Sequence, residues 1–516
     1  MHLRFRVLVS LVVLPGLIDA RTTSSHTFFS MRPNFQSAMP ERVSLFRNEL
    51  LDENQGVGGA IEIVAFGGKT TKEGRGKLAG FFLPPGCTTT TLHVKEFNPV
   101  KEARAANTDD GNPLKDLEAR HFNIRTVEET FASTITILPE QSIAAVGFAY
   151  KQTLSAKCDG TPGFWFELSF PIERIMNRTN LCETIENDGG GPRDELGLDN
   201  SPRVGNMIDA LSQCNWRFGR IIRKNQNKTG VGDVEFKFGY NSCNCDAYSL
   251  ATYGTFVLPT GNRVEGKALF EPIVGNNRHF GISLGNSFAY QMWCRGRHTV
   301  TMYIDGNTRY LMSNNQVRSF DLVGKPWGRY METYQRSEEA SQAALTDDEN
   351  SGTSGINVFT RCVRVSPHFQ GSYNTAIILN RSSDCSSLML EVGYNLFLRQ
   401  AEVLDFECSN TISAAALKAV DGKGQTTLAR TIKNNFIASR FTLEERYASI
   451  SNCDIDVETA AHPATISNTF YGTVGYRWER ECPFFVAFGG SYEFTTSEIT
   501  TAPDRWLLWG KFGVTF

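Results

Sequence analysis

The sequence predicts an all-β fold: a closed antiparallel transmembrane β-barrel of about 16 strands (about 14–18), with a few short loop helices. Apolar and polar residues alternate with a period of two, along segments longer than the roughly five or six residues of an ordinary strand. Charged residues occur within the polar faces, as a water-filled interior permits. Aromatic residues recur near strand ends, where the two membrane–water interfaces are expected.

Composition narrows the class of protein further. The chain has 516 residues and a net charge of −3, from 52 basic and 55 acidic residues, which gives no basic surface for nucleic acid. The 36 Phe, 15 Tyr and 45 Gly favour sheet over helix. Beyond residue 20 no run of 18 apolar residues occurs, which excludes a helical membrane protein. A barrel stays possible, because half of its strand residues are polar.

Residues 1–20 are predicted to be a signal peptide. Arg4 and Arg6 precede an apolar run from Val7 to Ile18, and Ala20 is a small residue before a cleavage site. The alternative is a short buried or anchoring helix, which is disfavoured because the run is too short to span a bilayer.

Residues 21–57 are expected to form a periplasmic lead-in to the barrel. Pro40 suits the start of a helix, and Val43, Phe46 and Leu50 follow at helical spacing. This short amphipathic helix packs against or inside the barrel, or it lies on the surface of a soluble domain.

The barrel is expected to occupy residues 58–516, because the period of two begins at Ile61. Leu78 to Leu83 is expected to be a short strand near its start, and Ser387 to Arg399 alternates best, with Leu388, Leu390 and Val392 on one face. Further strands are predicted over Arg278 to Trp293, His298 to Tyr310, Phe470 to Trp478 and Phe484 to Phe494.

The last stretch, Trp506 to Phe516, places six residues on one face, with Gly510 as the only gap. It resembles the C-terminal closing strand of bacterial outer-membrane β-barrel proteins, in which a terminal Phe and alternate apolar positions are the assembly signal. The resemblance implies residence in the bacterial outer membrane, contact with its lipid and recognition by the barrel-assembly machinery, and it leaves open whether the chain forms a homo-oligomer. It assigns the barrel-closing strand to Trp506, Leu508, Phe512, Val514 and Phe516.

Chain length predicts the width of the barrel. At about 55–60 residues per hairpin, the part after Ile61 gives about eight hairpins, and such a barrel encloses a water channel. We therefore expect a porin-like channel for passive diffusion of small solutes or ions, and the lead-in is too short to form a separate plug domain. The pore-lining candidates are Lys267, Glu271, Asp305, Arg309, Glu391, Arg399, Arg477 and Glu493.

No motif indicates catalysis, a cofactor or a metal. Gly281-Ile-Ser283-Leu-Gly285 has the spelling of a nucleophile elbow, but the alternation runs through it without the required strand-to-helix turn. The eight His are never spaced as a local metal pair. The sequence thus predicts no enzyme.

Twelve Cys in an exported chain suggest disulfides. They leave two alternatives to the channel open. One is a structural or adhesive barrel with disulfide-linked surface loops, and the other is a secreted, disulfide-rich β-protein.

Overall fold

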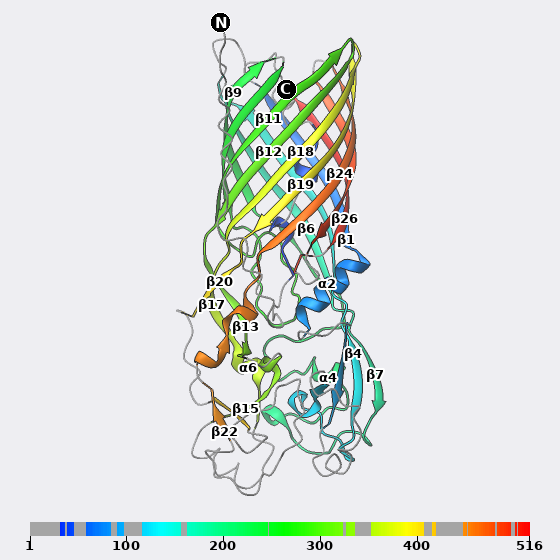
Figure 1. Ribbon diagram of the computed structural model, residues 1–516, viewed down its shortest axis with the longest axis vertical. Coiled ribbons are helices and arrows are strands. Elements are labelled where there is room, and N and C mark those ends of the chain that lie inside the picture. Colours follow the sequence, from blue (N-terminus) through cyan, green and yellow to red (C-terminus); the bar gives the residue numbers. More distant parts are fainter. Residues whose placement is uncertain are drawn as a thin grey trace.

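In the computed structural model, twelve antiparallel strands form a closed ring, and a cap built from the connections covers one end of it (Figure 1). The structure describes residues 31–36, 39–45, 58–83, 90–96, 116–155, 163–245, 247–323, 327–335, 352–406, 415–418, 447–450, 452–479, 482–496, 501–502 and 504–516.

The ring closes because the first and last strands pair. Their antiparallel register runs from Ala60 opposite Thr515 to Thr70 opposite Arg505. The strands of the ring are β1 (Gly59–Thr70), β5 (Glu140–Thr153), β6 (Phe164–Arg178), β9 (Val234–Cys245), β10 (Tyr248–Leu258), β11 (Gly281–Arg295), β12 (His298–Leu311), β18 (His368–Ser382), β19 (Ser386–Arg399), β24 (Thr465–Trp478), β25 (Phe484–Thr495) and β26 (Arg505–Thr515). Strand β8 (Gln226–Val231) pairs with one half of β6 and lies outside the ring.

The prediction of about 16 strands is wrong. The assumed length of about 55–60 residues per hairpin was too short. The strands reach 15 residues in β6, β11 and β18, and the connections at the loop end are also longer than assumed. At the loop end, residues 71–139, 179–233, 259–280, 312–367, 400–464 and 496–504 connect the strands. At the turn end, next to Gly59 and the C-terminus, the connections are residues 154–163, 246–247, 296–297, 383–385 and 479–483.

The two faces of the strands differ as the alternation predicts. On β26, Leu508 is 60% exposed on the outer face, whereas its neighbours Leu507 and Trp509 are 3% and 4% exposed. Val392 on β19 is 62% exposed, and Glu391 beside it is fully buried. The apolar side chains therefore face outward from a single ring, which is the arrangement of a barrel in lipid and not that of two stacked sheets.

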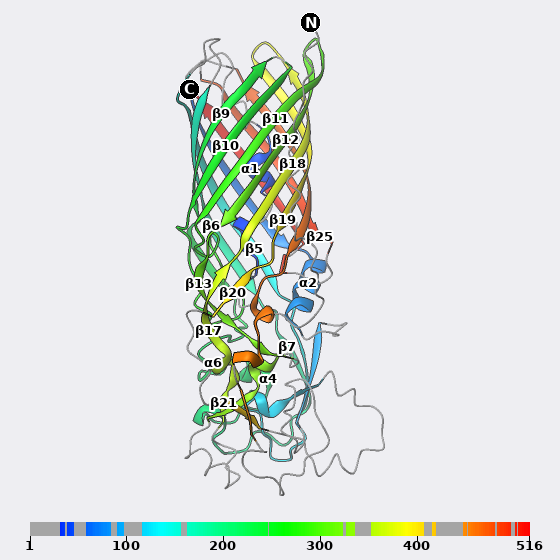
Figure 2. The ribbon, with the colours of Figure 1, turned by 60° about the vertical axis from the view of Figure 1, so that its left-hand side comes forward.

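The connections at the loop end fold together into the cap (Figures 1 and 2). Its sheets have the strand orders β3-β2-β4-β7, β13-β17-β20, β16-β15-β21-β22 and β14-β23. Its strands are β2 (Thr91–Lys95), β3 (Asp116–Glu118), β4 (Ala132–Thr136), β7 (Cys182–Asn187), β13 (Asn314–Ser319), β14 (Asp321–Leu322), β15 (Glu332–Gln335), β16 (Thr353–Ser354), β17 (Thr360–Ser366), β20 (Val403–Asp405), β21 (Ala415–Lys418), β22 (Tyr447–Ser449) and β23 (Ile455–Asp456).

Short helices complete the loop end. They are α2 (Lys72–Phe82), η2 (Ala119–Phe122), η3 (Leu198–Asn200), α4 (Met207–Ala210), η4 (Gly328–Tyr330), α6 (Gly355–Phe359), η7 (Asn452–Asp454) and η8 (Val457–Ala460). The strand expected over Leu78 to Leu83 is wrong, since these residues end α2. Thr71 caps this helix by accepting from the backbone N–H of Gly74 at 3.1 Å, and the apolar run Leu78–Leu83 packs into the cap. None of the described helices is long and apolar enough to cross a membrane.

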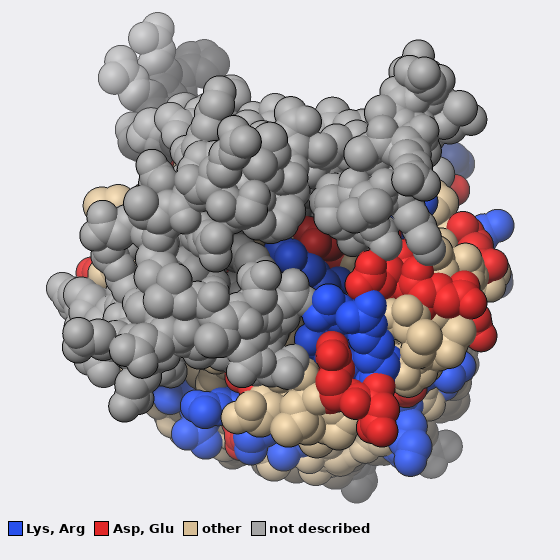
Figure 3. Space-filling model, turned by 90° about the horizontal axis from the view of Figure 1, so that it is seen from below, with Lys and Arg blue, Asp and Glu red and all other residues tan. Residues whose placement is uncertain are grey.

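An aromatic cluster holds the cap together. The Trp327 ring lies 5.2 Å from Phe82 and 5.1 Å from Tyr330, measured between ring centroids, and Trp216 stacks on Tyr330 at 5.3 Å. The Trp327 indole N–H donates to the carbonyl of Phe82 at 2.9 Å, which joins α2 to the segment around η4. On the outer face of the cap, acidic and basic side chains are interspersed over its described part (Figure 3).

The disulfides expected within the chain are not found among the described cysteines. The structure has exposed free thiols at Cys182, Cys214, Cys294, Cys362, Cys385, Cys453 and Cys482. Four of these residues belong to cap connections and three to the turn end, so the two groups lie at opposite ends of the barrel.

The stability of the cap should fall as the pH drops below about 6.5, because His121 is buried in its neutral form. The backbone N–H of Glu332 donates to His121 Nδ1 at 3.2 Å, and burial together with the Arg120 charge lowers the pKa of this histidine to about 3. Between pH 6.5 and 3 the unfolded cap binds a proton that the folded cap does not. Each pH unit therefore costs about 1.4 kcal/mol of stability.

This slope, the change in the free energy of unfolding per pH unit, can be measured by following the fluorescence of buried Trp216 and Trp327 during denaturation. His121→Gln, which keeps an acceptor for the Glu332 N–H, should flatten the slope, whereas the exposed control His93→Gln should leave it unchanged. An unaltered slope in His121→Gln would contradict the assignment.

Candidate functional site

The lumen of the barrel contains a piece of the chain itself. Residues 31–36 and 39–45, here the N-terminal segment, include η1 (Asn34–Gln36) and α1 (Pro40–Val43), and Figure 2 shows α1 within the ring. Phe35, Glu41 and Ser44 of this segment are buried. The helix expected near Pro40 thus exists in shortened form, and its place is inside the barrel.

At the loop end, the N-terminal segment is held by buried charges. Arg32 forms an ion pair with Glu493, to which Arg505 Nε also donates at 2.8 Å. Arg505 Nη1 donates to the side-chain oxygen of Asn34 at 2.7 Å. Arg399 Nη1 donates to Gln36 Oε1 at 3.0 Å. Side chains of three strands, β19, β25 and β26, therefore hold this part of the segment.

Further along the segment, Glu235 on β9 is the main anchor. One of its carboxylate oxygens accepts from Arg42 Nη2 at 2.6 Å, and the other pairs with Arg309 on β12. Arg42 also donates to Ser169 Oγ at 2.7 Å, and the Arg309 guanidinium lies 4.7 Å from the centre of the Phe35 ring. One carboxylate therefore ties a segment arginine to a barrel arginine, and its single negative charge is shared by the two cations.

The last contacts of the segment involve its backbone. The Leu45 N–H donates to Glu391 Oε2 at 2.6 Å, and the Tyr471 hydroxyl donates to the other oxygen of the same carboxylate at 2.7 Å. Lys511 Nζ donates to the Ser44 carbonyl at 2.7 Å and lies 3.3 Å from Glu62. The barrel thus holds the segment by its main chain as well as by its charges.

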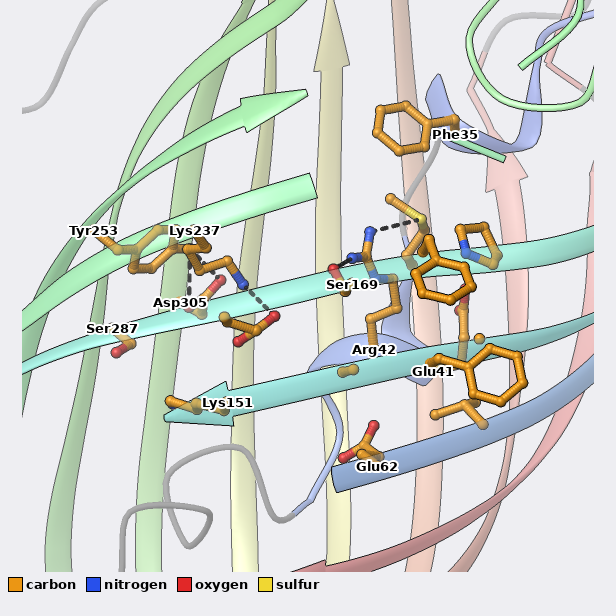
Figure 4. A pocket seen from close by; sticks show the side chains of 18 of the residues that line it. Phe35, Glu41, Arg42, Glu62, Lys151, Ser169, Lys237, Tyr253, Ser287 and Asp305 are labelled. Atoms are coloured by element: carbon orange, nitrogen blue, oxygen red, sulfur yellow. Dashed lines mark hydrogen bonds and ion pairs between the residues drawn. The ribbon is translucent and has the colours of Figure 1, made fainter. Parts of the chain in front are cut away.

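The N-terminal segment leaves two small cavities beside it. The larger one, of about 90 Å³, lies between the segment and β1, β5, β6, β9, β10, β11 and β12 (Figure 4). In its wall Lys237 pairs with Glu167 at 3.1 Å, Lys151 Nζ lies 4.2 Å from the centre of the Trp165 ring, and the Tyr253 hydroxyl donates to Asp305. The second cavity, of about 60 Å³, touches Phe35, Arg309 and Phe397. Each has room for only a few water molecules.

Lumen-facing polar atoms on the other side of the ring lack protein partners. Asn374 Oδ1, Asn395 Oδ1, Thr473 Oγ1 and Trp509 Nε1 are buried and form no hydrogen bond within the described structure. Buried polar groups of this kind are ordinarily satisfied by water. The interior of the ring therefore mixes such polar atoms with a buried apolar cluster that includes Val64, Phe66 and Leu507.

The structure brings several of the predicted pore-lining residues together around the segment. Arg309, Glu391, Arg399 and Glu493 contact it directly. Asp305 lines the larger cavity, and Arg477 lies at the turn end of β24, 3.3 Å from Glu479. Their role in conduction stays a prediction.

Lys267 and Glu271 do not lie on barrel strands, contrary to expectation. They belong to the connection between β10 and β11. There Glu271 closes a turn by accepting from the backbone N–H groups of Glu265, Gly266 and Ala268, and exposed Lys267 pairs with Glu265. The positions of Lys267 and Glu271 are therefore set by a local turn, and the alternation of a strand did not apply to them.

The five predicted residues of the closing strand lie on the outward face of β26. Trp506, Leu508, Phe512 and Phe516 are exposed and Val514 is half-buried, while Lys511 on the opposite face points into the lumen.

Sequence reasoning missed the segment's own anchors. Arg32 and Arg42 stand in a stretch without the period of two, so no pattern marked them as lumen residues. Glu62 and Glu235 had a usable signal, because each is an acidic residue between two apolar neighbours of a strand with a period of two.

Solved outer-membrane β-barrels resemble the chain at very low identity. An outer-membrane channel from Pseudomonas putida F1 is 10% identical with a TM-score of 0.34, covering 90% of this chain and 97% of that one. The translocator domain of the autotransporter NalP from Neisseria meningitidis is 9% identical with a TM-score of 0.27, covering 92% and 93%. The transport unit of the autotransporter AIDA-I from Escherichia coli is 7% identical with a TM-score of 0.30, covering 92% and 94%.

The sequence matches no known protein family and no characterised protein sequence. The class therefore follows from the architecture itself. A closed antiparallel ring with an apolar exterior and a charged interior is an outer-membrane-type β-barrel, and the predicted resemblance to these proteins is confirmed at the level of fold.

Glu235→Gln should loosen the N-terminal segment. The substitution leaves Arg42 and Arg309 without their shared carboxylate, which we expect to cost about 3 kcal/mol, because both arginines are largely buried. Hydrogen–deuterium exchange of the residue 39–45 amides should then accelerate.

The matched control is Glu140→Gln, which also removes a buried carboxylate held by two cations, Lys69 and Arg75, but outside the lumen. Equal exchange of residues 39–45 in both variants would show that Glu235 does not anchor the segment.

Proposed function

We propose that the protein is an outer-membrane channel through which small solutes or ions diffuse passively, and that the N-terminal segment sets the open width of its lumen. The observation that carries the proposal is the set of lumen charges that holds the segment. Arg309, Glu391, Arg399, Glu493 and Lys511 bind a piece of chain that is not itself a strand of the ring.

Barrel size supports this proposal. A barrel of about eight strands is filled by its own side chains, whereas about 16 strands leave an open channel. Twelve strands lie between these limits, and here the extra width accommodates one segment and two small cavities. Displacement of the segment would leave a path lined by charged side chains, which is the basis of selection in a passive pore.

The remaining expectations belong to the same proposal. Residues 1–20 would direct export, the outward face of β26 would be recognised by the barrel-assembly machinery, and the chain would work without a cofactor as a non-enzyme. Among the described residues, no group of three or more His, Cys, Asp or Glu is arranged to hold a metal ion.

Conductance across a planar lipid bilayer tests the proposal. The unaltered chain should show small or rare openings, because buried ion pairs hold the segment inside the lumen. The double variant Arg32→Gln/Arg42→Gln should raise the open fraction, by about tenfold for each 1.4 kcal/mol of lost holding energy.

Arg297→Gln, at an exposed turn where Arg297 pairs with Asp384, is the control and should behave as the unaltered chain does. Absence of conductance in all three proteins would refute the channel.

A second candidate function is a structural barrel cross-linked into the cell envelope. Free, exposed thiols stand at successive hairpins of the turn end, Cys294 beside the β11–β12 turn, Cys385 in the β18–β19 turn and Cys482 in the β24–β25 turn. Each of the three stands in a different hairpin and none is paired with another described cysteine, which leaves them available for bonds to other chains.

Non-reducing gels of isolated membranes distinguish this role. If the turn-end thiols form intermolecular disulfides, the chain should migrate as oligomers that a reductant dissolves, and Cys294→Ser/Cys385→Ser/Cys482→Ser should abolish them. The cap variant Cys182→Ser/Cys214→Ser/Cys453→Ser is the matched control. Monomers without reductant would eliminate the structural role.

A further inference from the structure

The outer face of the ring has a groove where β26, β1, β5 and β6 meet. Its floor consists of small residues, Ala65, Gly67, Ala144 and Gly510. Its sides are formed by larger apolar residues, Val146, Ile172, Phe488 and Leu508. The groove has a volume of about 570 Å³, which is within the range of roughly 300–1,000 Å³ typical of small-molecule sites.

The position of the groove defines what can fill it. Ala65, Ala144, Val146 and Leu508 belong to the outward face of the barrel, which in a membrane meets hydrocarbon. A smooth barrel wall would pack against disordered lipid tails, whereas a recess of this size offers one chain contact on three sides. Close packing against apolar walls then favours an acyl chain that stays in place.

Cationic side chains border the groove at its loop end. Arg174 lines the groove itself, is exposed, and forms no ion pair within the described structure. Lys69 lies on the same outward face as Gly67, one step closer to the loop end, with its side chain 38% exposed. Lys69 and Arg75 share the single carboxylate of Glu140, and buried Glu173 also lines the groove, so the site has three cations, two anions and an excess of one positive charge.

We propose that this groove is a binding site for a phosphate-bearing membrane lipid. An acyl chain lies along Ala65, Gly67 and Ala144, and the phosphate is bound by Arg174 and Lys69 at the level where lipid headgroups begin. Arginine and lysine near a membrane surface each contribute about 1 kcal/mol to the binding of anionic lipid. The proposal depends on the barrel lying in a membrane and is independent of whether it conducts.

A second copy of the chain is a poorer occupant. A two-fold contact brings the same patch of both subunits together, so the cationic borders would face each other. The excess positive charge favours a partner of opposite charge, and a lipid phosphate supplies it.

Native mass spectrometry of the full chain tests the site. The protein is released from vesicles with equal amounts of phosphatidylglycerol, which is anionic, and phosphatidylcholine, which is zwitterionic. We expect one phosphatidylglycerol to stay bound to the unaltered chain. Arg174→Gln should reduce its retention about fivefold, since about 1 kcal/mol is lost, and Ala144→Phe should abolish it by filling the groove.

Two variants on the same outward face serve as matched controls. Arg381→Gln removes an exposed arginine of β18 near the turn end, and Gly472→Phe adds a ring on β24, where a Cβ has room. Both should retain the lipid as the unaltered chain does. Heat-modifiable gel migration confirms that every variant has folded.

Three results would overturn the proposal. The first is equal retention of the two lipids by the unaltered chain. The second is equal retention of phosphatidylglycerol by Ala144→Phe and Gly472→Phe. The third is a dimer of the unaltered chain that Ala144→Phe dissociates, which would assign the groove to a second copy.

Discussion

The pairing of β1 with β26 is the constraint on which the rest of the structure depends. Lipid offers no hydrogen-bond partner, so every N–H and C=O of a spanning strand must bond to another strand, and only a closed ring has no free edge. Eleven register pairs join β1 to β26, and this closure fixes an inside and an outside for every other strand. The outward position of Leu508 and the inward position of Lys511 follow from it.

Once an inside exists, the charges placed there need partners. A carboxylate such as Glu235 would be costly to bury alone, and here Arg42 of the N-terminal segment and Arg309 of the barrel neutralise it. Ring and segment are therefore complementary, because each supplies charges that the other requires. The largest apolar cluster lies in the cap around Trp327 and Tyr330, and a smaller one, which includes Val64 and Leu507, lies on the inward face of the ring. The molecule thus combines a barrel interior of mixed charged and apolar side chains with a conventional hydrophobic core in the cap.

The sequence predicted features that depend on a period of two and missed those that depend on contacts between distant residues. Alternation identified β19, β25 and β26 and assigned their faces, because side-chain direction along a strand is local geometry. The number of strands was wrong, because strand length and cap size leave no periodic signal. Glu391 and Arg399 were predicted from their position on the inward face of a strand. Arg32 and Arg42 were not, because their place in the lumen depends on contacts between the N-terminal segment and strands that are distant in sequence.

The location of the N-terminal segment limits the order in which the molecule can assemble. Arg32 lies near the loop end of the lumen, whereas β1 begins at the turn end, so the chain traverses the lumen before it enters the wall. Once β26 has paired with β1, the segment can enter only through an end, and the cap covers one of them. Residues 31–45 must accordingly be in place before β26 docks, or they must enter afterwards through the turn end, which the cap does not cover.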